Sequence, residues 1–209
     1  TLGTFGAMST LSFHETKNIT CGEGGALVLN DPRLIGRAEI LREKGTDRSR
    51  FLRGQVDKYT WTDVGSSWVM SDLLAAVLVG QLERFSEIQN NRIALWDRYE
   101  QELADWAESL GVIRPQIPDT AKHTGHMYYL RFNSNQRRDA FIEHMRSRGV
   151  TSVFHYQALH RSLIAQRLGE QPACSIADET ARTLVRLPMF NNLPESDQAT
   201  VITAALAFS

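Results

Sequence analysis

The sequence predicts an α/β fold, in which short strands and helices alternate along the chain. Near the N-terminus, residues 8–13 and 25–30 are apolar runs with the length and composition of strands, and Asp31-Pro32 then begins a helix. After Pro115, strand patterns and helix patterns alternate again. The chain has 209 residues, of which 42% are hydrophobic and 22% are charged, so it is long enough to bury one substantial core.

The first two apolar runs are expected to be buried strands of one sheet, because they are short and contain aromatic or β-branched residues. Lys17 lies on the connection between them, at the end of the first strand. Burial there would disfavour the charged ammonium and leave a neutral amine, which reacts with carbonyl compounds. A lysine near a strand end is also commonly a solvated surface residue, so its position alone leaves both interpretations open.

The next elements are mainly helical. The helix that begins at Asp31 should run to about Glu43 and stop before Gly45, whereas residues 51–68 have no clean period and are expected to form an extended loop. From residue 73 to residue 110, apolar side chains recur in steps of three and four, which predicts one long helix or two helices with a kink near residues 89–91. We expect its aromatic residues to pack in a core, because basic residues do not interleave with them.

A second domain is predicted to follow. Residues 115–125 are rich in proline, glycine and polar residues, which places the boundary between residues 1–114 and a smaller α/β domain of residues 115–209. The smaller domain should contain extended segments at residues 126–132, 150–154 and 185–188, and helices at residues 135–148, 159–168, 175–184 and 194–208.

Composition excludes several classes of function. The net charge of −1 creates no field that would attract nucleic acid or an anionic membrane, so neither is an expected partner. No apolar run approaches the roughly 20 residues that a membrane helix needs, and we expect a cytoplasmic protein. Cys21 and Cys174 are too far apart for a Cys-x-x-Cys motif and are expected to be free, buried thiols.

Motifs for other chemistries are missing from the sequence. His123 and His126 have no thiol or carboxylate beside them, and His155 and His160 lack the spacing of a helical His-Glu-x-x-His motif, so we expect no metal site. There is no Gly-x-Ser-x-Gly elbow, Walker loop or Gly-x-Gly-x-x-Gly motif. These absences leave Lys17 as the candidate reactive group.

Residues 12–18 read Ser-Phe-His-Glu-Thr-Lys-Asn, and residues 22–26 read Gly-Glu-Gly-Gly-Ala. This pattern resembles the cofactor-lysine segment of the DegT/DnrJ/EryC1/StrS family of sugar aminotransferases, which use pyridoxal 5′-phosphate (PLP). The resemblance continues to the C-terminus. It implies the C-terminal part of a fold-type-I PLP-dependent transferase, with an incomplete large-domain sheet followed by a small α/β domain. The implied reaction transfers an amino group from glutamate to a dTDP-4-keto-6-deoxyhexose, for nucleotide-sugar and lipopolysaccharide biosynthesis, and the implied assembly is a homodimer.

The resemblance also implies roles for the residues around the lysine. Lys17 would hold PLP covalently and move a proton between substrate and cofactor. Ser12 would donate a hydrogen bond to the cofactor phosphate, and His14 and Asn18 would line the cofactor.

Two further groups of residues match family segments. Residues 65–72 resemble the family's Gly-x-Asn-Tyr-Arg-Met segment and are most similar to the dTDP-4-amino-4,6-dideoxygalactose transaminases. Ser67 there replaces an asparagine that reaches the partner's cofactor phosphate across the dimer, and a serine can still donate one hydrogen bond. Five residues of the small domain would face the mouth of the active site and bind the nucleotide sugar: His126, Tyr128, His155, Tyr156 and His160.

The sequence departs from the family pattern at the aspartate that keeps the pyridine nitrogen protonated. That aspartate precedes the lysine in the family, whereas Asp31, Asp47, Asp57 and Asp63 all follow it here. We therefore expect the 209-residue chain alone to have low activity. The alternative is a noncatalytic domain that associates with itself. The PLP dehydratases of the family carry histidine at the lysine position, so Lys17 argues against that activity.

Overall fold

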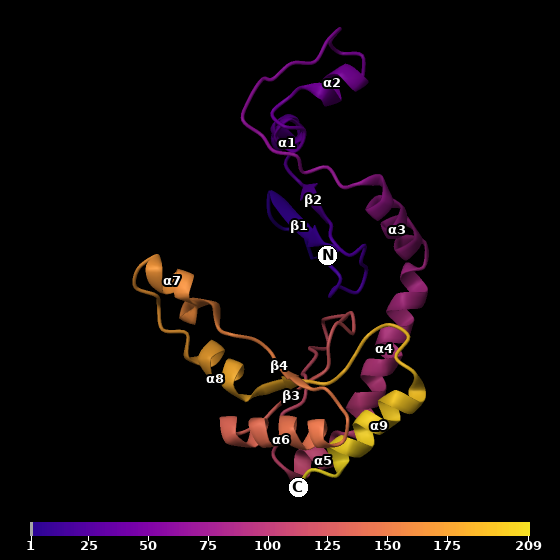
Figure 1. Ribbon diagram of the computed structural model, residues 1–209, viewed down its shortest axis with the longest axis vertical. Helices are drawn as coiled ribbons and strands as arrows, with labels where there is room; N and C mark the ends of the chain where they lie inside the picture. The colour runs from indigo at the N-terminus through magenta and orange to yellow at the C-terminus, as the bar shows by residue number, and fades with distance from the viewer. Residues whose placement is uncertain (1) are drawn as a thin grey trace. The chain divides into compact units, whose positions relative to one another are not determined.

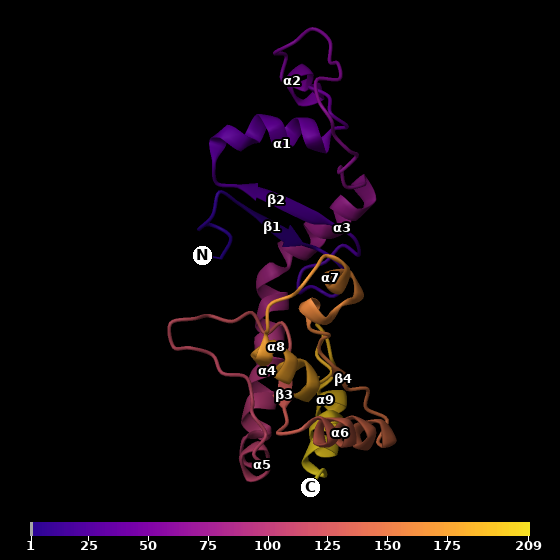
Figure 2. The ribbon, with the colours of Figure 1, turned by 90° about the vertical axis from the view of Figure 1, so that its left-hand side faces the viewer.

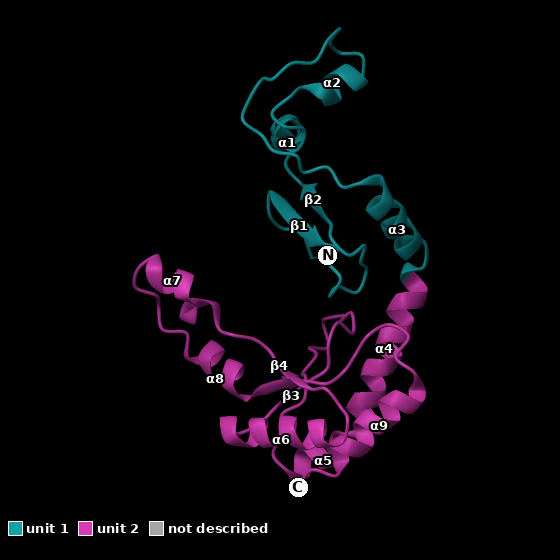
Figure 3. Cartoon of the chain, viewed as in Figure 1, with its two compact units in different colours: residues 1–85 teal, residues 86–209 magenta. Residues whose placement is uncertain are grey.

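The structure is a computed structural model that describes residues 2–209. The chain forms two compact units, Thr1–Phe85 (the N-terminal unit) and Ser86–Ser209 (the C-terminal unit), as Figure 3 shows. The structure therefore divides the chain after Phe85, whereas the sequence predicts a domain boundary after residue 114. Within the described residues, none of the helices is long and apolar enough to cross a membrane.

The N-terminal unit begins with a two-stranded sheet. Strands β1 (Met8–Ser12) and β2 (Gly25–Leu29) pair antiparallel, with Met8 opposite Leu29 and Ser12 opposite Gly25 (Figure 2). The prediction of two paired strands is confirmed, but the prediction that they are buried is wrong: Met8 is 52% exposed and Leu27 is 49% exposed. A strand is buried only where other elements cover both faces of its sheet. Within the described residues β1 and β2 form a sheet of two strands only, and their exposed apolar side chains show that its faces are not fully covered.

The helix expected after β2 forms at the predicted place. Asp31 is its N-cap, because its Oδ1 accepts a hydrogen bond of 3.0 Å from the backbone N–H of Arg33, and Pro32 occupies the first turn. The segment starts as a 3-10 helix, η1 (Pro32–Leu34), and continues as α1 (Ile35–Arg42). The region expected to be a loop includes the end of a short helix, α2 (Arg48–Leu52).

The long helical tract is divided into three helices: α3 (Asp72–Glu83), α4 (Phe85–Glu102) and α5 (Ala104–Ser109). The first break lies at Arg84 and not near residues 89–91, where the kink was expected. Helix α4 continues through that polar stretch, and Gln89 there uses its side chain to donate a hydrogen bond of 2.8 Å to the carbonyl oxygen of Thr124. Its amide therefore does not compete with the helix backbone.

The C-terminal unit is built on a three-stranded antiparallel sheet in the order β3-β5-β4, with Val185 of β5 opposite both Leu130 and Phe154. In Figures 1 and 2, helices α6 and α9 lie close to this sheet. The elements are β3 (Tyr129–Arg131), α6 (Asn135–Ser147), β4 (Val153–Phe154), η2 (Leu159–Arg161), α7 (Leu163–Arg167), α8 (Ser175–Thr183), β5 (Leu184–Arg186) and α9 (Glu195–Leu206).

One hydrophobic core holds this unit together and explains where the unit begins. The side chains of Tyr99 on α4, Leu103 at the junction of α4 and α5, and Ala107 on α5 are fully buried. They pack with Leu130 of β3 and Phe141 of α6. Burial of a large apolar side chain stabilises the fold by about 1.5–3 kcal/mol. Because α4 and α5 contribute their apolar face to this core, they belong to the C-terminal unit and not to the domain that precedes residue 115.

Candidate functional site

The connection from β1 to β2 is a closed loop that carries Lys17 at its turn. The backbone N–H of Phe13 donates to the carbonyl oxygen of Gly24, and the N–H of Cys21 donates back to the carbonyl oxygen of Phe13, at 2.8 and 3.0 Å. Lys17 closes the turn, because its own N–H donates to the carbonyl oxygen of His14 at 2.9 Å. The prediction that Lys17 lies on a connection at the end of a strand is therefore confirmed.

Gly24 of this loop makes room for two neighbouring side chains. A Cβ atom at Gly24 would lie 2.6 Å from Cys21 Sγ and 2.6 Å from Met70 Cε, which is closer than carbon and sulfur can approach. The contact with Met70 ties the loop to the segment that precedes α3. Gly24 thus allows Cys21 and Met70 to pack against the backbone of the loop that carries Lys17.

Lys17 itself is exposed. The sequence raised the possibility of a desolvated amine, but the described residues of this chain do not bury it. The residue that would react with an aldehyde is instead accessible at the tip of a fixed loop. Its neighbour Asn18 is half-buried in the same turn.

His14 is engaged with polar groups of its own loop. Its Nδ1 accepts a hydrogen bond of 3.2 Å from the backbone N–H of Thr16 and lies 3.0 Å from the Thr16 hydroxyl. Because Nδ1 accepts from that N–H, the neutral ring carries its proton on Nε2, which lies 3.6 Å from Glu23 Oε1. His14 therefore orients the loop that holds Lys17.

Ser12 is exposed at the end of β1, where its Oγ accepts a hydrogen bond of 3.4 Å from the backbone N–H of His14. That contact leaves the hydroxyl proton free to donate to another group. Ser67 is also exposed and pairs with Glu43 in an isolated antiparallel bridge. Backbone hydrogen bonds on both sides of Ser67, from Lys44 to Ser66 and from Trp68 to Arg42, fix its segment along the end of α1.

The groups near Lys17 fit part of what PLP requires. An accessible amine suits its aldehyde, and the Ser12 hydroxyl suits its phosphate. Three of the four aspartates that follow the lysine already have partners: Asp31 binds Arg33, Asp63 binds Arg37, and the buried Asp47 accepts a hydrogen bond of 2.8 Å from the backbone N–H of Thr60. The fourth, Asp57, is exposed.

Of the residues predicted to bind substrate, Tyr128 is positioned differently from expectation. Tyr128 is fully buried in the core, and its hydroxyl donates a hydrogen bond of 2.9 Å to Glu100 Oε2. Burial and the adjacent Glu100 carboxylate raise the pKa of Tyr128. His126 is half-buried, and its carbonyl oxygen accepts a hydrogen bond of 2.6 Å from Arg92 Nη2. Tyr128 is therefore a core residue and not part of an open binding surface.

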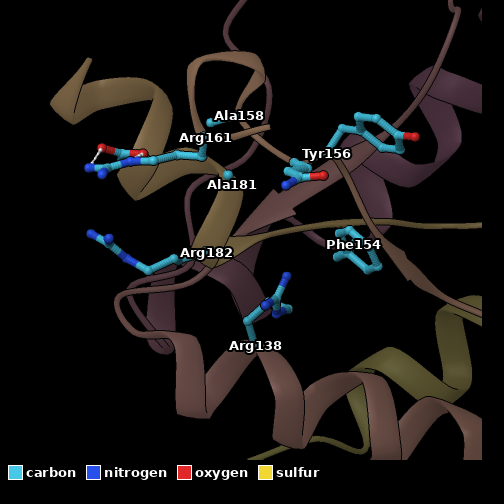
Figure 4. A pocket seen from close by; sticks show the side chains of 9 residues that line it. Arg138, Phe154, Tyr156, Ala158, Arg161, Ala181 and Arg182 are labelled. Atoms are coloured by element: carbon cyan, nitrogen blue, oxygen red, sulfur yellow. Dashed lines mark hydrogen bonds and ion pairs between the residues drawn. The ribbon is translucent and has the colours of Figure 1, made fainter. Parts of the chain in front are cut away.

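The other three predicted residues lie at or beside a groove in the C-terminal unit (Figure 4). Tyr156 lines this groove. The adjacent His155 is half-buried, and burial together with the charge of Arg186 lowers its pKa. His160 is largely buried, with its Nε2 3.0 Å from Oδ1 of the groove residue Asp178.

Sequence reasoning missed the charged residues of the same groove. Arg161 binds Asp178 through two hydrogen bonds, of 2.9 Å from Nε and 2.7 Å from Nη2, and this pairing holds the pKa of Asp178 below its usual range. Arg138 and Arg182 also line the groove. These three arginines come from η2, α6 and α8, so no local spacing in the sequence relates them.

The two cysteines are free thiols, and the potential metal ligands do not form a cluster in the described residues. Cys21 is buried and Cys174 is half-buried, and both are free. Over residues 2–209, no group of three or more His, Cys, Asp or Glu side chains is arranged to hold a metal ion.

The lysine loop between paired strands, the helical connection and the small α/β unit are the parts of a fold-type-I transferase fold that this chain contains. Two solved structures share this arrangement. The aminotransferase TlmJ of Streptoalloteichus hindustanus superposes with a TM-score of 0.84 at 28% identity, over 99% of this chain and 53% of that chain. Spr1654 of Streptococcus pneumoniae, described as a sugar aminotransferase and solved in its PMP form, superposes with a TM-score of 0.85 at 21% identity, over 99% of this chain and 54% of that chain.

Sequence comparison defines the family. The model of the DegT/DnrJ/EryC1/StrS aminotransferase family matches residues 1–206, and the chain belongs to this family. Among its relatives, GDP-perosamine synthase of Caulobacter vibrioides is 31% identical over 97% of this chain and 52% of its own length. An uncharacterized protein of Methanocaldococcus jannaschii is 26% identical over 97% of this chain and 54% of its own length. The chain thus spans about half the length of the curated relatives it matches.

Proposed function

We propose that this chain is the lysine-bearing part of a PLP-dependent aminotransferase that transfers the amino group of glutamate to a nucleotide-linked keto sugar. The observation that carries the proposal is the fixed β1–β2 loop, which presents the accessible amine of Lys17 in a chain of an aminotransferase family. One structural neighbour has been solved in a PLP form and a PMP form, which supports the choice of cofactor.

Lys17 would hold the cofactor through Nζ, and the same amine, once released, would carry a proton to or from the substrate carbon. Ser12 would donate its hydroxyl proton to the cofactor phosphate, since its oxygen already accepts from the His14 N–H. His14 and Asn18 would line the cofactor beside Lys17, and His14 keeps the loop in position. When bound, PLP supplies the electron sink for proton removal.

The proposed acceptor is a dTDP-4-keto-6-deoxyhexose. The segment Gly65 to Asp72 supports the dTDP subgroup, whereas the name of the Caulobacter relative specifies a GDP-linked sugar. Both nucleotides present the same diphosphate, so the groove arginines of the C-terminal unit suit either substrate. The base therefore has to be identified by direct comparison of the two substrates.

A homodimer is the proposed assembly, with Ser67 acting on the partner's cofactor phosphate. Helix α3 supports self-association: it is apolar over most of its length, none of its residues is buried, and Leu73 is 81% exposed. An apolar helix left uncovered favours association with another protein surface. The same helix is the observation that favours the second candidate, a noncatalytic domain that only self-associates.

Transfer of isotope distinguishes the two functions. The protein is incubated with PLP, ¹⁵N-glutamate and either dTDP-4-keto-6-deoxyglucose or the corresponding GDP sugar, and the sugar product is analysed by mass spectrometry. We expect ¹⁵N in the amino sugar with the wild-type protein and none with Lys17→Ala. Equal labelling with Lys17→Ala would exclude the proposed role of this lysine. No labelling with either protein, combined with a dimer in solution, would favour the noncatalytic domain.

A further inference from the structure

The groove of the C-terminal unit has a volume of about 560 Å³ and chemically different ends (Figure 4). The rings of Phe154 and Tyr156 lie at one end. The guanidinium groups of Arg161 and Arg182 lie at the other end. Arg138, on α6, lies between the two ends of the groove.

The aromatic end offers a flat apolar surface. The rings of Phe154 and Tyr156 are nearly parallel, with an interplanar angle of 12° and centroids 6.5 Å apart. Both are exposed, Phe154 by 53% and Tyr156 by 65%. The guanidinium carbon of Arg138 lies 5.9 Å from the centroid of the Phe154 ring and restrains that ring by a cation–π contact. Exposed aromatic rings that are held in place bind planar aromatic ligands by stacking.

The other end carries an excess of positive charge. Arg161 is oriented by its two hydrogen bonds to Asp178, which leaves its Nη1 without a partner in that pair. Arg182 is exposed and forms no ion pair within the described part of the chain. Arg138 is mostly buried and bound to Asp139 and Asn135, so it contributes charge from a fixed position. Guanidinium groups donate in a planar fork that matches phosphate oxygens.

We propose that this groove is a subsite for the nucleoside diphosphate end of the substrate. The base stacks on Tyr156, and the diphosphate binds Arg182 and Arg161, with Asp178 holding Arg161 in position. This inference rests on the proposed function, because it assigns the nucleotide of that substrate to particular residues. It adds Arg161 and Arg182, which the sequence did not single out, to the predicted residue Tyr156.

The experiment measures binding of dTDP to the full chain by isothermal titration calorimetry, with PLP absent. We expect one site per chain, with inorganic pyrophosphate and thymidine each binding at least about tenfold more weakly than dTDP, because each occupies only one end of the groove. Arg182→Gln should weaken dTDP binding about tenfold or more, since it removes a charge-assisted hydrogen bond. Tyr156→Leu should weaken the binding of dTDP but leave the binding of pyrophosphate unchanged.

Arg146→Gln is the matched control. Arg146 also lies in the C-terminal unit, on α6, but it is exposed, pairs with Glu143 and does not line the groove. Circular dichroism of each variant verifies that the fold is retained. The proposal is overturned if dTDP does not bind, if Arg182→Gln and Arg146→Gln bind it equally, or if pyrophosphate binds as tightly as dTDP.

Failure of this inference is distinguishable from failure of the proposed function. The titration needs neither the cofactor nor Lys17, so Lys17→Ala should bind dTDP with unchanged affinity. If the protein attaches PLP at Lys17 but does not bind dTDP in the groove, only the proposed nucleotide subsite is overturned. If it binds dTDP but does not attach PLP, only the proposed aminotransferase function is overturned.

Discussion

The hydroxyl of Tyr128 donates a hydrogen bond of 2.9 Å to Glu100 Oε2, in the core of the C-terminal unit. Arg114 binds the other carboxylate oxygen of Glu100, so the tyrosine completes a half-buried polar network that joins α4 to the residue before β3. This contact makes Tyr128 a structural residue.

Tyr128→Phe should lower the free energy of unfolding by about 1–2 kcal/mol, because it removes one hydrogen bond to a charged acceptor without creating a cavity. Urea unfolding followed by tryptophan fluorescence measures the change. Tyr156→Phe, at an exposed ring of the same unit, should leave stability unaltered. If Tyr128→Phe were as stable as the wild type but lost nucleotide binding, the substrate role expected from the sequence would replace this account.

The pH dependence of stability should reveal two buried tyrosines. Burial raises the pKa of both Tyr99 and Tyr128, and the Tyr99 hydroxyl donates to the carbonyl oxygen of Pro188 at 2.7 Å. In the unfolded chain a tyrosine ionises near pH 10. A group whose pKa is raised on folding contributes full stability below its unfolded pKa and loses it as the pH rises above that value.

We therefore expect the free energy of unfolding to be independent of these tyrosines up to about pH 9.5 and to fall as the pH rises beyond 10. Absorbance at 295 nm should show that two of the five tyrosines ionise only together with unfolding. Ionisation of all five before any loss of circular dichroism would show that Tyr99 and Tyr128 are accessible.

Gly65→Ala should destabilise the N-terminal unit. A Cβ atom at Gly65 would collide with the backbone of Gly45, which itself has a φ of 77° and lies against the carbonyl group of Asp63. Relief of such overpacking costs about 1–3 kcal/mol. Hydrogen exchange should become faster at Lys44 and Trp68, whose amides bond across this contact, and remain unchanged in the C-terminal unit.

The matched substitution is Gly36→Ala, in helix α1 of the same unit, where an added methyl group meets no atom within 4 Å. It should stabilise the unit by about 0.5–1 kcal/mol, because alanine loses less backbone freedom in a helix than glycine. Equal effects of the two substitutions would show that the backbone contact between Gly45 and Gly65 does not form.

Arg92→Met should release the segment that precedes β3. The buried Arg92 donates to the carbonyl oxygens of Gly125 and His126, at 3.0 and 2.6 Å, and methionine fills similar space without a donor. Leaving these acceptors unpaired should cost about 2–3 kcal/mol and increase proteolysis between residues 115 and 125. Arg146→Met, at an exposed ion pair, should change neither quantity.

Local chemistry in the sequence was sufficient for several elements. The Asp31 cap, Pro32 in the first turn and the acidic first turn of α9 all occur as expected, because each depends on neighbours in the chain. The burial of Tyr128 could also have been predicted from the sequence pattern around it. Tyr128, Leu130 and Phe132 are buried while Tyr129 and Arg131 are half-buried, and this alternation of period two marks the core face of a strand.

Other features depend on contacts between distant segments. The burial of β1 and β2 could not be read from their composition, because an apolar strand is buried only if other elements cover it. The groove arginines Arg138, Arg161 and Arg182 lie more than twenty residues apart in the sequence, on three elements, and meet only in the folded unit. The division at Phe85 likewise depends on which core receives the apolar face of α4.

The most direct test of the central claim is the site at which PLP attaches. The protein is mixed with PLP, reduced with borohydride, digested and analysed by mass spectrometry, and the candidates are its four lysines, Lys17, Lys44, Lys58 and Lys122, with Lys58→Ala as the control for Lys17→Ala. We predict that the pyridoxyl group is found on Lys17, that Lys17→Ala loses it, and that Lys58→Ala retains it. Labelling spread evenly over the four lysines, or unaltered by Lys17→Ala, would contradict the account.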